Sequence, residues 1–191
     1  MMNITIKKDI LLLVEGRDEV GFFDALLKHI GVQENVQLVE VGGKDKFKNE
    51  FPALLLSPNF SAVRKYGIVR DADESAENTF QSVIGMLNRH NQPTPERPGE
   101  ISFSEDIAAG VFIMPGNSKE GMLEDLCLST VANHPVSVCV EEYISCLRVN
   151  LEHDKGSVSK DPCKHYFPKN EAKAKMHAFL AGMNKFVPSL G

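Results

Sequence analysis

The chain has 191 residues, of which 42% are hydrophobic and 25% are charged. This composition is typical of one soluble globular domain and excludes disordered, collagen-like and coiled-coil proteins. The net charge of -5 gives no overall basic surface for nucleic acid. Because the longest apolar run near the N-terminus, Ile10 to Val14, is too short for a membrane span or a signal peptide, we expect a cytoplasmic protein without membrane contact.

Up to Arg89, the sequence alternates between strand patterns and helix patterns. Short apolar runs predict strands, and apolar residues at helical spacing predict helices. The strands are expected at 8–15, 36–41 and 66–69, and the helices at 18–30, 44–56 and 74–89. Pro52 predicts a kink or a split in the second helix. This alternation predicts an α/β fold, with a parallel sheet covered by helices on both faces and functional groups at the carboxyl ends of its strands.

The second half of the chain has a different pattern, because helices dominate it. A connection rich in proline spans 91–100, and 101–107 with 110–114 predicts a short hairpin or edge pair. Helices are expected at 118–130, at 135–152 and at 171–183, the first capped by Asn117 or Ser118. We expect a single domain over residues 1–191, with a core at about 8–115 and a helical extension at about 116–191.

The four cysteines are Cys127, Cys139, Cys146 and Cys163. Their spacing matches neither a zinc site nor a dense disulfide framework. We therefore predict free and mostly buried thiols.

Three acidic residues follow two of the predicted strands. Glu15 ends the first strand, before Gly16, while Asp71 and Asp73 end the third. In extended backbone, residues i and i+2 point the same way, so all three carboxylates are expected at one edge of the sheet. Carboxylates that converge there repel one another unless a cation compensates them, and hard oxygen ligands suit Mg²⁺ or Mn²⁺. The sequence therefore predicts a divalent-metal site.

Each of these acids also has a structural explanation. Asp73 could cap the helix that follows it, and Glu15 could form an ion pair with Arg17. Asp18 is in the first turn of a helix, where it would interact favourably with the helix dipole, so we treat it as a supporting residue.

Two further groups of charged residues could simply face solvent. Lys44, with Lys46 and Lys48, could line the rim of the same site, or all three lysines could simply face solvent. Glu124 and Asp125 flank the apolar stripe of their helix, which is typical of a solvated helix face.

The segment Leu12-Leu13-Val14-Glu15-Gly16-x-Asp18, followed by Phe22-Phe23 and then by Ile68-Val69-x-Asp71-x-Asp73, resembles the topoisomerase-primase (Toprim) domain. This resemblance covers about residues 8–115. The later Gly121-Met122-Leu123-Glu124-Asp125-Leu126 and the helix from Lys173 to Ala181 resemble stand-alone Toprim-like proteins, which are distantly similar to the nuclease domain of the overcoming-lysogenization-defect family.

The resemblance implies a role for each matching residue. Glu15 would act as general acid/base or metal ligand, and Asp71 and Asp73 would bind metal. Glu124 would bind a second metal, and Lys173, with Lys175 as its nearest competitor, would neutralise transition-state charge. The chain has no P-loop and no zinc-binding module of the primase type, so we do not expect topoisomerase or primase activity.

Together these features predict metal-dependent phosphoryl transfer by a nuclease-like phosphodiester hydrolase that acts on nucleic acid or another phosphate ester. A catalytically silent Toprim-like module that binds nucleic acid or a protein partner is the main alternative. A phosphatase of the haloacid-dehalogenase type is a third, but Glu74-Ser75 stands where its motif requires a different turn.

Overall fold

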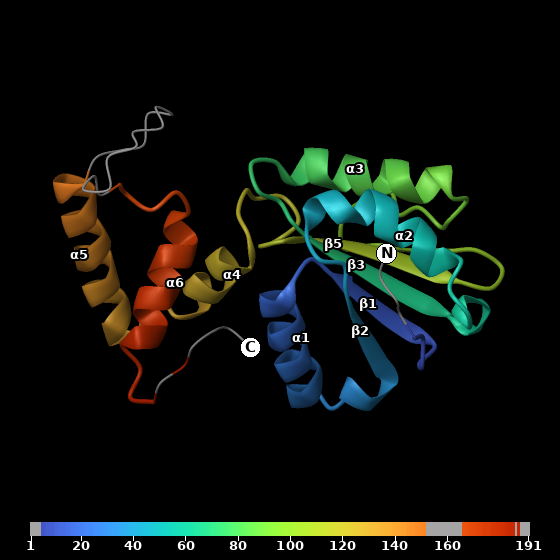
Figure 1. Cartoon of the computed structure of the whole chain (residues 1–191), viewed down its shortest axis with the longest axis horizontal. Coiled ribbons are helices and arrows are strands. Elements are labelled where there is room, and N and C mark those ends of the chain that lie inside the picture. The colour runs from blue at the N-terminus through green and yellow to red at the C-terminus, as the bar shows by residue number, and fades with distance from the viewer. Residues whose placement is uncertain (1–4, 152–165, 186, 188–191) are drawn as a thin grey trace. The chain divides into compact units, whose positions relative to one another are not determined.

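The computed structural model describes residues 5–151, 166–185 and 187. Within these residues the chain divides into two compact units, the first ending at Leu123 and the second beginning at Glu124. The first unit combines a sheet with helices, and the second is helical (Figure 1).

A five-stranded sheet forms the first unit, with the strand order β2-β1-β3-β5-β4. The strands are β1 (Ile10–Val14), β2 (Val36–Glu40), β3 (Lys65–Asp71), β4 (Ile101–Phe103) and β5 (Ala108–Met114). All neighbouring pairs are parallel except β4 and β5, which run antiparallel. The predicted parallel sheet is therefore confirmed, and so is the hairpin or edge pair at its border.

Helices cover both faces of this sheet, as the strand and helix alternation predicted. Helix α1 (Arg17–His29) lies on one face, while α2 (Phe47–Leu55) and α3 (Ala76–Arg89) lie on the other (Figure 1). The α/β fold class is confirmed.

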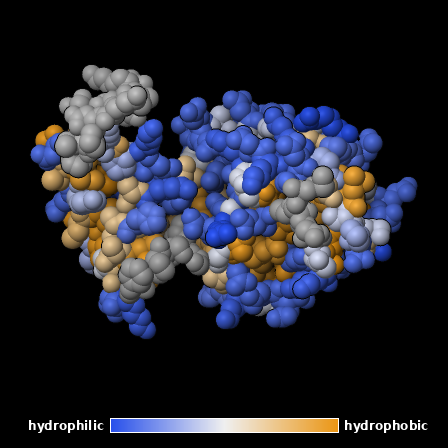
Figure 2. All heavy atoms as spheres, in the orientation of Figure 1, coloured by the Kyte–Doolittle hydropathy of each residue, from blue (hydrophilic) through white to orange (hydrophobic). Residues whose placement is uncertain are grey.

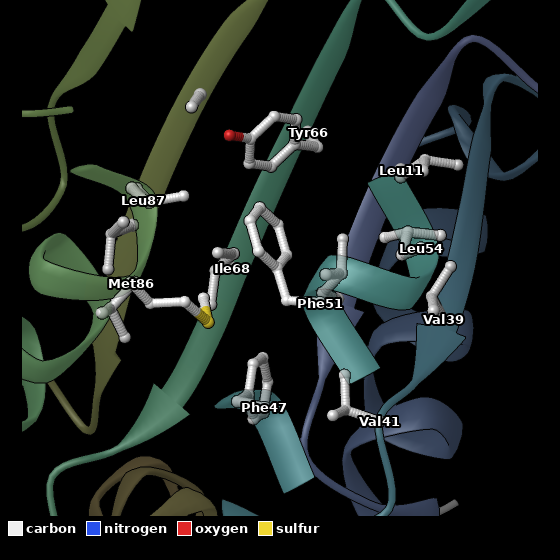
Figure 3. Close-up of a cluster of buried hydrophobic side chains, with 14 of the residues drawn as sticks. Leu11, Val39, Val41, Phe47, Phe51, Leu54, Tyr66, Ile68, Met86 and Leu87 are labelled. Carbon is white, nitrogen blue, oxygen red and sulfur yellow. The ribbon is translucent and has the colours of Figure 1, made fainter. Parts of the chain in front are cut away.

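The main apolar core lies between the sheet and the helices α2 and α3. Phe47, Phe51 and Leu54 of α2 occur at helical spacing, and all three are buried. They pack in one cluster with sheet residues and with α3 (Figure 3); the labelled members from these elements include Leu11, Val39, Tyr66, Ile68, Met86 and Leu87. Burial of one such leucine or phenylalanine side chain stabilises the fold by about 1.5–3 kcal/mol. This cluster holds α2 and α3 against one face of the sheet.

Pro52 does not split its helix, so of the two predicted outcomes, a kink or a split, the split is excluded. A 3₁₀ turn at Lys44–Lys46 precedes α2, and Pro52 lies inside α2. The segment changes from 3₁₀ to α-helix ahead of Phe47, where the side chain enters the core.

Helix α4 (Leu123–Thr130) begins five residues later than residue 118, the predicted start. The backbone of Gly121 instead exchanges two hydrogen bonds with Asp73, each of 2.9 Å. Asn117 does not cap a helix; its side-chain oxygen accepts a hydrogen bond from the backbone of Ile113 at 2.8 Å. The pairing of Gly121 with the distant Asp73 and the local hydrogen bond of Asn117 thus engage this segment outside the helix.

The second unit contains α5 (Pro135–Asn150) and α6 (Glu171–Ala181). Val140 and Ile144 of α5 and Met176 and Phe179 of α6 are its buried apolar residues. The predicted helical C-terminal region is confirmed, although α5 ends at Asn150 and Glu152 lies outside the described residues.

On the face shown in Figure 2, the surface of this helical unit is more apolar than the surface over α2 and α3. Cys127, Cys139 and Cys146 are free thiols, as predicted. Cys127 is partly buried, but Cys139 and Cys146 are exposed, so the prediction of burial is wrong for these two; Cys163 lies outside the described residues. In the part of the chain that the structure describes, every helix is too short or too polar to span a bilayer.

Candidate functional site

The carboxyl ends of β1 and β3 lie side by side, and this position brings Glu15 to the start of the Asp-x-Asp segment. Leu13 of β1 is in register with Ile68 of β3, so the residues that follow these strands meet at one edge. One carboxylate oxygen of Glu15, Oε1, accepts a hydrogen bond from the backbone N–H of Asp71 at 3.2 Å. Residues 56 positions apart in the chain are thus joined directly.

Arg70 also lies in the candidate site, and the sequence did not point to it. Its Nε donates a hydrogen bond of 2.5 Å to Oε1 of Glu15, and its guanidinium lies over the ring of Phe47, with 4.7 Å from Cζ to the ring centroid. The side chains of Arg70 and Glu15 are only 9% and 12% exposed. The partner considered for Glu15, Arg17, is exposed instead. The available signal was a basic residue directly after the run Tyr66 to Val69 and still inside β3, because a buried charge needs a partner.

Asp71 and Asp73 do not share one direction, because the extended backbone ends at Asp71. Asp73 has a φ of 51°, in the left-handed region, and its backbone pairs with Gly121. A carboxylate oxygen of Asp71 accepts a hydrogen bond from the backbone of Leu123 at 3.1 Å. The expectation of same-side carboxylates, which assumed extended geometry, is therefore wrong at Asp73.

Asp73 is also not the cap of the following helix. Ser75 caps α3, since its hydroxyl accepts a hydrogen bond from the backbone of Asn78 at 3.2 Å. The carboxylate of Asp73 instead forms an ion pair with Lys44, with 2.9 Å between Nζ and Oδ2. The capping explanation for Asp73 is thus excluded.

Two glycines bring Lys44 to this edge. The N–H groups of Gly42 and Gly43 both donate to the carbonyl of Glu15, each at 2.8 Å. Their φ values are 89° and 117°, a region that favours glycine. The hydrogen bond from Lys44 to Asp73 and the charge of this carboxylate raise the pKa of Lys44, and Asp45 and Glu15 add to this effect. Lys44 therefore stays protonated beside the acids.

Asp18 is exposed in the first turn of α1, which fits its supporting role on the helix dipole. The buried acid in this turn is Glu19, whose carboxylate accepts a hydrogen bond from the backbone of Gly16 at 2.9 Å. A glutamate three residues after the N-cap is a known capping signal and could have identified it.

Glu124 and Lys173 belong to the helical unit and form an ion pair, with 3.5 Å between Nζ and Oε1. The Glu124 side chain is only 7% exposed, so the solvated helix face predicted for it is wrong, while Asp125 is half-buried. Burial, together with the Glu124 charge, raises the pKa of the Cys127 thiol to about 11.

Lys175 contacts different acids from Lys173. It lies 2.8 Å from Glu141 and 3.1 Å from Glu171. Burial is the largest single influence and acts to lower the pKa of Lys175, but the hydrogen bonds to these two acids together with their charges raise it. In this arrangement Lys173, and not Lys175, is the lysine beside Glu124.

The donor chemistry of Glu15, Asp71 and Asp73 fits Mg²⁺ or Mn²⁺, since all three supply hard oxygens. Their arrangement in this structure is not that of a metal-binding site. Among the described residues, no three His, Cys, Asp or Glu side chains are placed so that they could hold one metal ion. Arg70 and Lys44 compensate Glu15 and Asp73 instead.

The chain belongs to the family described as "Protein of unknown function (DUF3226)", whose model matches residues 9–189. The comparison with curated proteins finds no match.

Solved structures of the C-terminal region of the OLD protein from Xanthomonas campestris pv. campestris are similar to this chain at a TM-score of 0.41. The mercury-phased structure is 14% identical and the iodine-phased structure 16%; each match covers 90% of this chain and 94% of the other. At this score, the relationship to the overcoming-lysogenization-defect family stays a prediction.

Proposed function

We propose that this protein is a Toprim-like, divalent-metal-dependent phosphoryl-transfer enzyme that hydrolyses phosphodiesters in the manner of a nuclease. One observation carries the proposal. Glu15, Asp71 and Asp73 gather with Arg70 and Lys44 at the carboxyl edge of β1 and β3. Carboxylates of the kind that bind divalent metals and bases that could bind a phosphate thus lie where parallel sheets place their functional groups.

Glu15, Asp71 and Asp73 would hold Mg²⁺ or Mn²⁺, with Glu15 and Asp73 exchanging their present partners for the ion. When bound, such an ion polarises the phosphodiester and makes water a better nucleophile. The Glu15 carboxylate accepts the proton that this water loses, at Oε1 or Oε2. Lys44, which is protonated, binds a phosphate oxygen. The roles that the resemblance implies for Glu124, as a ligand of a second metal, and for Lys173, as the residue that neutralises transition-state charge, stay predictions.

Two measurements on the whole chain test this proposal. Thermal melting with Mg²⁺ or Mn²⁺ reports binding, because an ion at about 100 times its dissociation constant stabilises the folded state by about 2.7 kcal/mol. We expect this shift in the wild type and in Asp18→Asn, whose altered acid is exposed nearby, but not in Asp71→Asn. Equal shifts in all three proteins would contradict the assigned site.

Turnover of labelled DNA and RNA is the second measurement. Loss of a general acid/base costs about 10²- to 10⁴-fold in rate, and we expect a loss in this range for Glu15→Gln. Glu15→Gln also leaves Arg70 without its partner and could therefore lose activity through misfolding. Asp73→Asn changes a more exposed acid, so it should disturb the fold less, and it should lose activity as well. Full activity in both variants would exclude the proposed mechanism.

A second candidate function is a catalytically silent module that binds nucleic acid or a protein partner. The compensation of Glu15 by Arg70 and of Asp73 by Lys44 favours it, because acids paired in this way need no metal. Binding of oligonucleotides without turnover in either metal, unaffected by Asp71→Asn, would support this alternative.

A further inference from the structure

A pocket of about 200 Å³ opens beside the acids, on the face of the sheet that α2 and α3 cover. Its lining is chemically divided between basic groups and an apolar wall. The lining residues are Lys44, Asp45, Phe47, Lys48, Arg70, Ser82, Val83 and Met86. Two of them reach the candidate site directly, because Lys44 binds Asp73 and Arg70 binds Glu15.

Arg70 offers hydrogen-bond donors to this pocket. Its side chain is about nine-tenths buried, and its Nε bonds Glu15. In the described part of the chain, neither terminal guanidinium nitrogen has a hydrogen-bond partner within the protein. No fully buried side-chain nitrogen or oxygen among the described residues lacks a partner, so these two nitrogens reach accessible space. Arg70 therefore presents free donors to the pocket.

From this geometry we infer that the pocket binds one phosphate group of the substrate. Three basic side chains against the single acid Asp45, with the hydroxyl of Ser82, match a phosphate in charge and in hydrogen bonding. Arginine in particular recognises phosphate through its planar fork. Phe47, Val83 and Met86 form the apolar wall of the pocket.

The size of the pocket restricts what it can hold. Ligand pockets for drug-sized molecules measure about 300–1,000 Å³, so this one fits a small anion and not a whole nucleotide. A phosphate seated here lies next to Glu15 and Asp73, because Arg70 and Lys44 contact both the pocket and these acids. The inference rests on the proposed function, since it assigns the pocket to the substrate of that same site. The phosphate belongs to a nucleic-acid strand, either at its 5′ end or in its backbone.

Lys48 is the residue with which to test the pocket. It is exposed, lines the pocket and takes no part in the proposed chemistry. Lys46, two positions away, is also exposed and does not line the pocket, so Lys46→Ala is a control for the loss of one positive charge. Ser82→Ala removes a neutral lining group and serves as the second variant.

The experiment measures fluorescence anisotropy of a short single-stranded DNA, with either a 5′ phosphate or a 5′ hydroxyl, in EDTA so that no turnover occurs. Loss of one charge-assisted contact predicts binding about tenfold weaker for Lys48→Ala, and weaker binding for Ser82→Ala. Lys46→Ala should change affinity less than twofold. Inorganic phosphate should displace the DNA from the wild type, but less effectively from Lys48→Ala.

The two DNA forms distinguish the sources of the phosphate. A defect of Lys48→Ala only with the 5′-phosphorylated strand identifies a terminal phosphate, and a defect with both strands identifies a backbone phosphate. Equal affinities for Lys48→Ala and Lys46→Ala, or no binding by the wild type, would overturn the inference. If the inference fails in this way, metal-dependent turnover that is lost in Asp71→Asn would still support the proposed function. Failure of the pocket inference and failure of the proposed function are therefore distinguishable.

Discussion

The same chemical pair, an arginine with a glutamate, occurs in both units of this protein in two different settings. Arg70 and Glu15 at the sheet edge are 9% and 12% exposed, whereas Arg148 and Glu171 in the helical unit are 48% and 35% exposed. Water can replace either partner of the exposed pair at little cost. It cannot do so for the buried pair, where each charge depends on the other. The comparison shows why only the sheet-edge pair can control a site: whatever takes Glu15 from Arg70 must itself bring positive charge.

Removal of Arg70 should have the largest effect. Arg70→Met keeps the apolar contact with Phe47 but leaves the Glu15 carboxylate buried without its partner. A broken buried pair costs about 3–5 kcal/mol, so we expect a loss of unfolding free energy in this range. Urea denaturation, with hydrogen exchange of the β3 amides to follow the sheet unit by itself, measures it. Arg148→Met is the matched control, and a similar small loss in both variants would show that burial does not separate the pairs.

The glycines that place Lys44 give an intermediate effect. An alanine at Gly43 meets no atom within 4 Å but would have to adopt a φ of 117°. An alanine at Gly85, within α3, also meets nothing within 4 Å and has helical backbone. We expect Gly43→Ala to destabilise the fold by about 1–2 kcal/mol. Gly85→Ala should stabilise it by up to about 1 kcal/mol.

Thermal melting of these two variants isolates backbone conformation, because neither added methyl group creates a clash. A loss of oligonucleotide affinity in Gly43→Ala but not in Gly85→Ala would further link the glycine turn to the position of Lys44. If both substitutions shift the melting temperature in the same direction, the backbone argument for Gly43 fails.

The sequence predicted the elements of the sheet unit well, because the apolar runs that form strands and the helical spacing of residues such as Phe47 and Phe51 are local signals. It also predicted that Glu15 and Asp71 follow neighbouring strand ends. It did not predict Arg70 as the partner of Glu15, since the two residues are 55 positions apart and a nearer arginine was available.

Long-range backbone contacts explain the other differences. The pairing of Asp73 with Gly121 both turns Asp73 out of the extended conformation and delays the start of α4. Neither effect leaves a pattern in the local sequence, because each depends on which distant segment lies alongside. The burial of Glu124 was missed for the same reason, since its helix position alone indicated a solvated face.

The exposed pair of the helical unit should show the smallest effect, and one that depends on pH. The hydrogen bond from Arg148 is the largest influence on Glu171 and lowers its pKa; the contacts with Lys175 act in the same direction, while burial opposes them. A carboxylate whose folded-state pKa is lowered stabilises the fold at pH values above its unfolded-state pKa, about 4.3 for glutamate, and this stabilisation disappears as the pH falls through the lower folded-state value.

Arg148→Ala should therefore reduce the unfolding free energy by about 0.2–1 kcal/mol near neutral pH and by almost nothing in strong acid, where Glu171 is protonated. Urea midpoints at the two pH values measure the difference, and added salt should shrink the neutral-pH effect by screening the charges. A loss of equal size in acid would mean that Arg148 stabilises the unit through its contact with the ring of Phe167, 5.5 Å from Cζ to the ring centroid, and not through Glu171. Both arginines would then contribute stability through an aromatic ring, Arg70 through Phe47 and Arg148 through Phe167. The two pairs would differ only in the burial of the glutamate.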